Sequence, residues 1–273
     1  MADIARSASR IPLLRFGPGV AARLRAAPSE AGVVHSVFER ALNLMWHDGH
    51  LLTLQGPGSR AAPFAAAGER LPRGVREEST VWRDSDFIRI GEARLDWREA
   101  ALVDTALAES RDGPGPALSR LIEMPSGGWS RGLDGPQGQR ARRQMSDGLR
   151  CRDAARFLDG ALGLVGLGEG LTPAGDDCLV GTLAVVHRFA RPWLLDHPEI
   201  RSTLERAASL GTTTVAREFI AHALAGHFAE DLVDLLTAGS AAAVGEASTR
   251  LLRTGATSGA DTLVGIRFAL SAL

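Results

Sequence analysis

The chain has 273 residues and a formal net charge of −1. It is long enough for one large or two small domains, and no overall field draws it to nucleic acid or a membrane surface. All 31 basic residues are arginine and tyrosine is absent, which excludes a lysine Schiff base and a Walker-type phosphate loop. Two cysteines without CxxC spacing predict neither a disulfide framework nor a zinc site. The first residues hold no long apolar segment, so we expect no signal peptide, no membrane span and a cytoplasmic protein.

The N-terminal third of the sequence has the pattern of a β-rich unit. Residues 1 to about 30 form an Ala/Arg-rich lead-in that we expect to be irregular or partly helical. Alternating and β-branched runs predict strands at 33–38, 41–46, 51–55, 80–82, 87–90 and 93–97. Asp48-Gly49 predicts the turn of a hairpin, and a Pro/Gly-rich connection follows to about residue 73. We therefore expect a small barrel or sandwich within residues 1–100.

Beyond Trp97 the apolar period becomes helical. Leu102, Val103, Ala106 and Leu107 predict one face of an amphipathic helix. Glycines predict a flexible link over 125–139, and a basic helix is expected over 140–158. Further helices are expected at 116–123, 198–209, 213–225, 229–237, 241–252 and 259–270. The predicted fold class is α+β, with a helical domain over residues 101–273.

The stretch from Gly163 to Gly181, GLVGLGEGLTPAGDDCLVG, predicts a glycine loop feeding a buried helix. Thr172 is the expected N-cap and Pro173 the first helical residue. Glycines allow close backbone approach, and the first N–H groups of a helix lack intrahelical partners, a combination that favours an oxyanion site. Asp176 and Asp177 would repel a bare anion, so the site requires a metal, an arginine or a ligand that also offers N–H donors.

The start of the last predicted helix repeats this motif. Gly175, Asp177, Leu179, Val180 and Gly181 align without a gap to Gly259, Asp261, Leu263, Val264 and Gly265, and a one-residue slip matches Thr172 to Thr257. Each aspartate shares a helix face with the glycine four residues later, which permits two helices to cross closely. We predict that both N-termini converge on one pocket. The alternative is two separately capped helices whose aspartates interact favourably with the helix dipole.

Two further candidates carry weaker signals. Thr212 or Thr213 could cap the helix that holds Arg217, and Arg217 could reach an anion, although capping and surface charge explain these residues equally well. His35 follows two valines and could point into a pocket, or be a satisfied strand residue. The arginines of the basic helix favour a solvated face.

These motifs resemble the AllH-like family, whose named member is the third subunit of oxamate carbamoyltransferase in anaerobic allantoin breakdown. The resemblance rests on GEGLTPAGDDCLVG at 168–181, with softer matches at Thr212-Thr213, at GATSGADTLVG (255–265) and at His35-Ser-Val-Phe38. It extends from about residue 32 to the end and is similar in plan, a β-rich part joined to a helical part. The family commonly carries a serine where this chain has Ala216.

The resemblance implies phosphate-dependent cleavage of oxalurate to carbamoyl phosphate and oxamate by a complex of three different proteins. Asp177 and Asp261 would accept hydrogen bonds from the carbamoyl and amide groups, and Asp176 would act as acid or base, or hold Mg²⁺ with Asp177. Backbone N–H donors would bind the oxyanion. The substrate-binding residues expected on this basis are Gly168, Gly170, Thr172, Gly175, Thr213, Arg217, Thr257, Ser258, Gly259 and His35.

Two other functions stay open from the sequence. One is a non-catalytic, metabolite-binding or scaffold subunit. The other is a small-molecule kinase, because Gly163 to Ala174 resembles the glycine-rich phosphate loop of GHMP-type kinases, although the order of strands and helices and the paired aspartates fit that family poorly.

Overall fold

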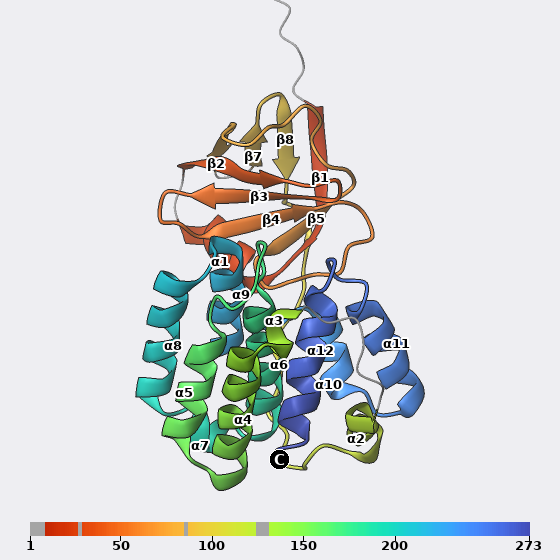
Figure 1. Cartoon of the computed structure of the whole chain (residues 1–273). Helices are drawn as coiled ribbons and strands as arrows, with labels where there is room; N and C mark the ends of the chain where they lie inside the picture. Colours follow the sequence, from red (N-terminus) through yellow and green to blue (C-terminus); the bar gives the residue numbers. More distant parts are fainter. Residues whose placement is uncertain (1–8, 27–28, 85–86, 124–130) are drawn as a thin grey trace, which may run out of the picture. The chain divides into compact units, whose positions relative to one another are not determined.

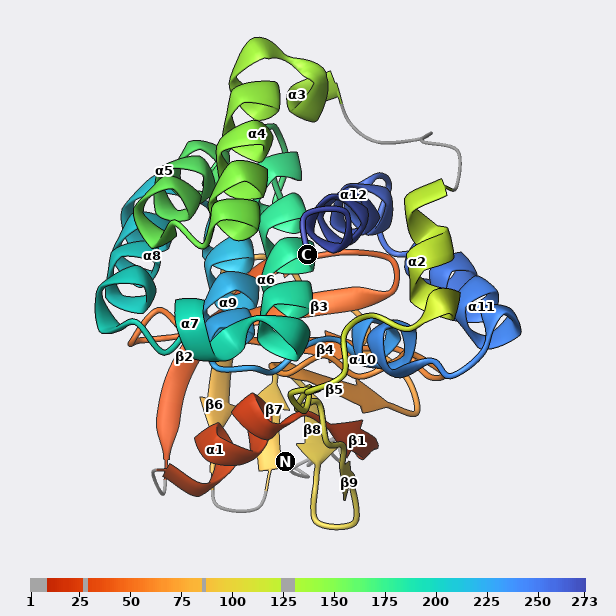
Figure 2. The ribbon, with the colours of Figure 1, turned by 90° about the horizontal axis from the view of Figure 1, so that it is seen from below.

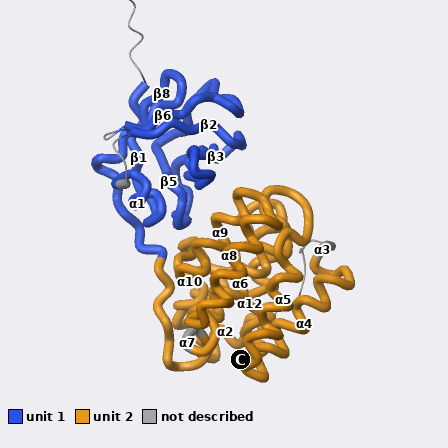
Figure 3. The backbone as a smooth tube through the Cα atoms, turned by 90° about the vertical axis from the view of Figure 1, so that its left-hand side faces the viewer, with its two compact units in different colours: residues 1–105 blue, residues 106–273 orange. Residues whose placement is uncertain are grey.

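The computed structural model describes residues 9–26, 29–84, 87–123 and 131–273 (Figure 1). The chain divides into two compact units, residues 1–105 and residues 106–273 (Figure 3). The predicted α+β class is confirmed: strands form the first unit and helices the second.

The first unit is a closed β-barrel. Its strands are β1 (Ser9–Phe16), β2 (Glu30–Val37), β3 (Ala41–Trp46), β4 (Leu51–Gln55), β5 (Ala65–Gly68), β6 (Thr80–Arg83), β7 (Phe87–Ile90), β8 (Ala93–Asp96) and β9 (Ala101–Leu102). They pair in the order β5-β4-β3-β2-β6-β7-β8-β1-β9, and a further pairing of β5 with β1 closes the barrel. Of the two predicted forms, barrel or sandwich, the barrel is therefore the one observed.

Inward-facing apolar residues fill the barrel, and the predicted hairpin is confirmed. Ile11, Val34 and Leu44 belong to a single buried cluster. β3 pairs with β4 in antiparallel register, and Gly49 takes a φ of 79° in the connecting turn. That left-handed conformation suits glycine, so the Asp48-Gly49 signal located the turn correctly.

Three sequence-based expectations in this unit were wrong. The lead-in contains helix α1 (Pro18–Ala26), in agreement with the expected partial helix, but it also contains strand β1, which was not expected. The expected connection before residue 73 contains strand β5. β5 reads AAAG, and alanine has low strand propensity, so its pairing with β1 and β4 decides its structure. The amphipathic helix expected after Trp97 is absent from the described residues: Ala101–Leu102 pairs with β1, and the Val103 N–H donates to the Phe16 carbonyl over 2.9 Å.

The second unit packs its helices around one apolar core. They are α2 (Pro116–Glu123), α3 (Arg131–Asp134), α4 (Pro136–Cys151), α5 (Ala154–Leu164), α6 (Ala174–Phe189), α7 (Arg191–Leu194), α8 (Pro198–Gly211), α9 (Thr214–Leu224), α10 (Glu230–Thr237), α11 (Ala241–Leu251) and α12 (Ser258–Leu270). α6 is buried on nearly every side, from Ala174 to His187. In Figure 2 it lies beside α12, against which it packs along its length.

The expected basic helix over 140–158 is two helices. Arg152 takes a φ of 54° between α4 and α5, and the Asp153 carboxylate accepts a hydrogen bond from the Arg156 N–H at the start of α5. A Cβ atom on Gly148 would lie 2.5 Å from the Phe157 backbone nitrogen, so the small residue allows α5 to fold back on α4. Residues 136–139, expected in a flexible link, form the first turn of α4, and residues 125–130 of that link lie outside the described residues.

In the described part of the chain, none of the helices has both the length and the apolar character needed to cross a bilayer.

Candidate functional site

The site is built on the crossing of α6 and α12, which the two glycines make possible. A Cβ atom on Gly181 would lie 2.1 Å from the Thr262 carbonyl oxygen, and one on Gly265 would lie 2.0 Å from the Cys178 carbonyl oxygen. Real Cβ atoms do not approach backbone this closely. The repeated glycine four residues after each aspartate therefore does what the sequence predicted, and brings the two helix backbones into contact.

The N-terminal ends of the two helices meet. The Thr172 hydroxyl, just before α6, lies 2.7 Å from the Ser258 hydroxyl at the start of α12. Two turns that are 86 residues apart in the sequence are thus joined by a hydrogen bond. The predicted meeting of the two helix starts is confirmed, and the alternative of two unconnected capped helices is wrong. The pocket predicted between them stays a prediction.

The predicted capping role of Thr172 is also wrong. Pro173 is the N-cap of α6, because its carbonyl accepts from the Asp176 and Asp177 N–H groups over 2.9 and 3.1 Å. Thr257 precedes α12 without making a side-chain cap. Thr172 therefore uses its hydroxyl across the helix pair instead of along its own helix.

Asp177 and Asp261 form a buried acidic pair beneath these hydroxyls. Asp177 is 8% exposed and Asp261 is 0% exposed. Burial raises the pKa of Asp177 to about 8, and the negative charges of Asp261 and Asp176 act in the same direction. Hydrogen bonds from Ser258 and Thr172 oppose this rise only in part. The buried pair therefore retains a proton at neutral pH.

Asp176 has a different task, which is to hold the glycine loop. One carboxylate oxygen accepts from the Gly166 N–H over 2.9 Å, and the other accepts from the Thr212 hydroxyl. Burial raises the pKa of Asp176, and these two hydrogen bonds oppose the rise. Both oxygens are used inside the fold, so the predicted acid, base or metal-binding role does not suit this residue.

Thr213 fastens the other end of the same loop. Its hydroxyl donates to the Leu171 carbonyl over 2.5 Å, and it caps α9 by accepting from the Ala216 N–H over 3.1 Å. The predicted capping of α9 is confirmed. Thr212 and Gly166 were missed as loop contacts, since no local signal reports hydrogen bonds between segments so far apart.

The glycines of the motif divide into two groups. Gly168 and Gly170 are exposed and take φ values of 122° and 87°, so they form the open part of the loop. Gly175 and Gly259 are buried, and their Cβ atoms would lie 2.1 Å and 1.8 Å from the carbonyl oxygens of Leu164 and Leu251. The latter two are close-packing positions.

The acidic residues present do not fit the possible Mg²⁺ site. Asp176 uses both carboxylate oxygens on Gly166 and Thr212, so it is not placed to share a metal ion with Asp177 as predicted. In the described ranges, no three His, Cys, Asp or Glu side chains gather where they could hold a metal ion. No step of the chemistry below is therefore assigned to a metal.

Two expected site residues have other surroundings. His35 lies on β2 in the first unit, where its Nδ1 atom is 3.1 Å from the Ser36 hydroxyl. Arg217 lies on α9, and its guanidinium is 3.7 Å from the Glu218 carboxylate. Their roles in binding substrate stay predictions.

Two family models match the chain. The model described as "Oxamate carbamoyltransferase subunit AllH" matches residues 164–270, and the model described as "AllH family N-terminal domain" matches residues 12–102. The first match contains the whole α6–α12 site, and the second contains nearly all of the barrel. No solved structure matches the chain.

Proposed function

Because the chain belongs to the AllH family, we propose that it is the subunit of a carbamoyltransferase complex in which phosphate cleaves oxalurate to carbamoyl phosphate and oxamate. The observation that carries the proposal is the joint between α6 and α12. Two like-built helix starts, linked through Thr172 and Ser258, cover an acidic pair that retains a proton at neutral pH.

The bonds that form and break in this reaction require a proton at the leaving nitrogen. A phosphate oxygen forms a bond to the carbamoyl carbon, and negative charge develops on the carbamoyl oxygen. The bond from that carbon to the nitrogen of oxamate then breaks. The departing nitrogen carries the electron pair and must take up a proton, because an amide anion is a poor leaving group.

Asp177 is the residue suited to supply that proton. It lies under the surface and hydrogen-bonds to the Ser258 and Thr172 hydroxyls, which are half-buried. A hydroxyl can pass a proton on, since it both donates and accepts. The proton would leave Asp177 through one of these hydroxyls and reach the nitrogen of oxamate. The proton released by the attacking hydrogen phosphate, as its oxygen bonds to the carbamoyl carbon, would then restore the acid.

The glycine loop and the hydroxyls supply the remaining contacts. Gly168 and Gly170 are exposed, so the backbone between them is open to a small ligand. Backbone N–H groups at the loop would stabilise the carbamoyl oxyanion. Thr172, Thr257 and Ser258 would bind the carboxylate and phosphate, and the braces from Asp176 and Thr213 hold the loop in place for this task.

The test is an assay of the assembled complex. The chain is co-expressed with the other two subunits, and carbamoyl phosphate formed from oxalurate and phosphate is measured. Asp177→Asn should lower kcat by about 10²- to 10⁴-fold, the usual contribution of a positioned acid. The matched control is Asp159→Asn, an exposed aspartate on α5, which should leave kcat unchanged.

Ser258→Ala tests whether the Ser258 hydroxyl passes the proton on or only joins the two helix starts. It removes the hydroxyl but keeps the buried acid, so kcat should fall while the complex stays assembled. Full turnover by the Asp177→Asn complex would refute the catalytic proposal, and would leave the metabolite-binding or scaffold function in its place.

A further inference from the structure

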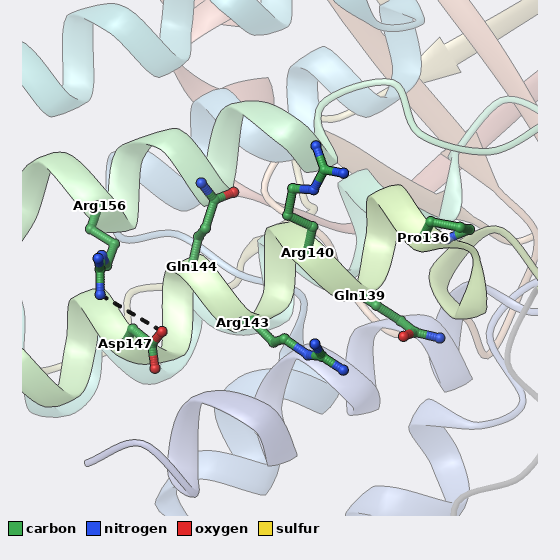
Figure 4. Close-up of a pocket in the computed structure, with 7 residues that line it drawn as sticks. All are labelled: Pro136, Gln139, Arg140, Arg143, Gln144, Asp147 and Arg156. Carbon is green, nitrogen blue, oxygen red and sulfur yellow. Dashed lines mark ion pairs between the residues drawn. The ribbon is translucent and has the colours of Figure 1, made fainter.

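The exposed side of α4 carries an arginine surface that the site at α6 and α12 does not use (Figure 4). One hollow of about 450 Å³ lies along it, lined by Pro136 and the side chains that we call the arginine face: Gln139, Arg140, Arg143, Gln144 and Asp147 of α4, with Arg156 of the neighbouring α5. A second hollow, of about 440 Å³, adds Arg142, Ser146, Arg150 and Phe268 of α12. The two hollows share Gln139, Arg143 and Asp147, so they form one continuous grooved surface.

The positive charge of the arginines on this surface is not neutralised by carboxylates of the same surface. Asp147 is the one carboxylate among the residues that line the two hollows. It is shared by Arg150 at 3.6 Å and Arg156 at 3.8 Å. Within the described residues, Arg140 and Arg143 make no hydrogen bond or ion pair, and both are exposed.

Not every arginine of α4 lacks partners, as the neighbouring Arg142 shows. Arg142 is half-buried and has partners: it donates to the Leu133 carbonyl over 2.9 Å and lies 3.8 Å from the Asp134 carboxylate. Ala141, Met145 and Leu149 form the buried side of α4. The helix therefore packs on one side, with α5 against it, and presents the guanidinium groups of Arg140 and Arg143 on the other.

We propose that the arginine face of α4 is the docking surface for an acidic face of another subunit in the same complex. The inference rests on the proposed function, which requires partner subunits. Exposed arginines presented on a rigid helix are suited to bidentate pairing with carboxylates, and arginine is enriched at protein interfaces. The two hollows flanking the α4 ridge would receive side chains of that partner.

Two other occupants fit less well. A second copy of this chain, related by a twofold axis, would bring arginine against arginine, because such a contact places the same patch on both sides. A nucleic-acid backbone would meet Asp147 in the middle of the surface, and that carboxylate repels phosphate. An acidic protein surface with one basic or hydrogen-bonding group opposite Asp147 meets neither obstacle.

The test is the affinity of the purified full chain for the other two subunits, measured by biolayer interferometry and by size-exclusion chromatography. The variant is the double reversal Arg140→Glu/Arg143→Glu. The matched control is Arg120→Glu/Arg206→Glu, which makes the same change in charge at two exposed arginines on α2 and α8. Circular dichroism establishes that both variants are folded.

The α4 reversal should weaken binding at least about 100-fold, and the control should weaken it less than about 3-fold. Binding of the unaltered chain should also fall between about 50 mM and about 300 mM NaCl, since salt screens the contact. Unchanged assembly and activity with the α4 reversal would refute the docking surface while leaving the proposed function intact. A reversal that abolishes binding to a short DNA duplex but not to the subunits would refute it as well. If the unaltered chain binds neither subunit at low salt, the proposed function fails, and the docking surface fails with it.

Discussion

The starts of α6 and α12 share a sequence motif and differ in what surrounds it. In both, the amide of the motif glycine reaches back to a loop carbonyl: Gly175 to Leu167 over 2.7 Å and Gly259 to Thr254 over 3.0 Å. The loop closed at α6 is longer, and it exposes Gly168 and Gly170. The α12 turn is shorter, and its aspartate is the more deeply buried.

The bracing of the two turns differs as well. Thr212 and Thr213 fasten the loop before α6 through Asp176 and Leu171. The residue of the α12 motif aligned with Asp176 is Ala260, which has no carboxylate to hold a loop. The start of α6 therefore supplies a braced, open loop, and the start of α12 supplies a buried acid and a hydroxyl beside it.

The largest expected effect comes from breaking the crossing on which both copies depend. Gly181→Ala or Gly265→Ala should lower the free energy of unfolding by about 3 kcal/mol or more, because the new Cβ overlaps the backbone of the facing helix. Urea unfolding followed by circular dichroism measures the loss.

Gly245→Ala in α11 is the control for that pair. A Cβ atom there meets nothing within 4 Å, so the change should stabilise the chain by up to about 1 kcal/mol through helix propensity. Equal effects at positions 181 and 245 would contradict the close crossing.

A second prediction concerns the protonated acid. The pKa of Asp177 is raised to about 8 in the folded chain, above its ordinary value of 3.8. Its stabilising contribution is therefore present in full below about pH 4 and is lost as the pH rises to about 8, at about 1.4 kcal/mol per pH unit. Between pH 5 and pH 7 the loss from this group is roughly 3 kcal/mol.

Asp177→Asn should remove this dependence, since an amide does not titrate. The difference in unfolding free energy between the variant and the unaltered chain should move in favour of the variant as the pH rises from 5 to 8. Parallel stability curves for the two proteins would show that Asp177 titrates normally.

Loss of one hydrogen bond that braces the loop before α6 should lower the free energy of unfolding by a smaller amount. Thr212→Val keeps the shape of the side chain but removes the donor to Asp176, which should cost about 1.5 to 3 kcal/mol, the range for a hydrogen bond to a charged group. Hydrogen exchange should rise at Gly166, whose N–H donates to the same carboxylate. Thr254→Val, before α12, is the matched change outside the brace, and protection at Gly166 should not respond to it.

The smallest effect should separate a true cap from a threonine that only resembles one. Thr213→Ala removes the N-cap of α9 and should cost about 1 kcal/mol. Thr257→Ala should cost less than about 0.5 kcal/mol, because Thr257 makes no side-chain cap. Thermal unfolding of the two variants is sufficient, and a larger loss at Thr257 would show a cap that the structure does not contain.

Much of the fold was predictable where local signals and tertiary structure agree. The Asp48-Gly49 hairpin and the helix over residues 116–123 follow from turn chemistry and apolar period. β5 and the region after Trp97 were not predictable, because the pairing of the first with β1 and the hydrogen bonds of the second override weak local preference. The break at Arg152 was missed since a left-handed arginine has no reliable sequence signal.

The sequence by itself determined that two helix starts carry the same glycine and aspartate, and that their glycines would let the helices cross. This followed because glycine spacing reports backbone approach directly. Only the tertiary structure decided what each polar group does: Thr172 bonds to Ser258 instead of capping, Asp176 holds the loop, and Asp177 keeps a proton. Those roles depend on burial and on partners distant in the chain. Neither can be predicted from the neighbouring residues in the sequence.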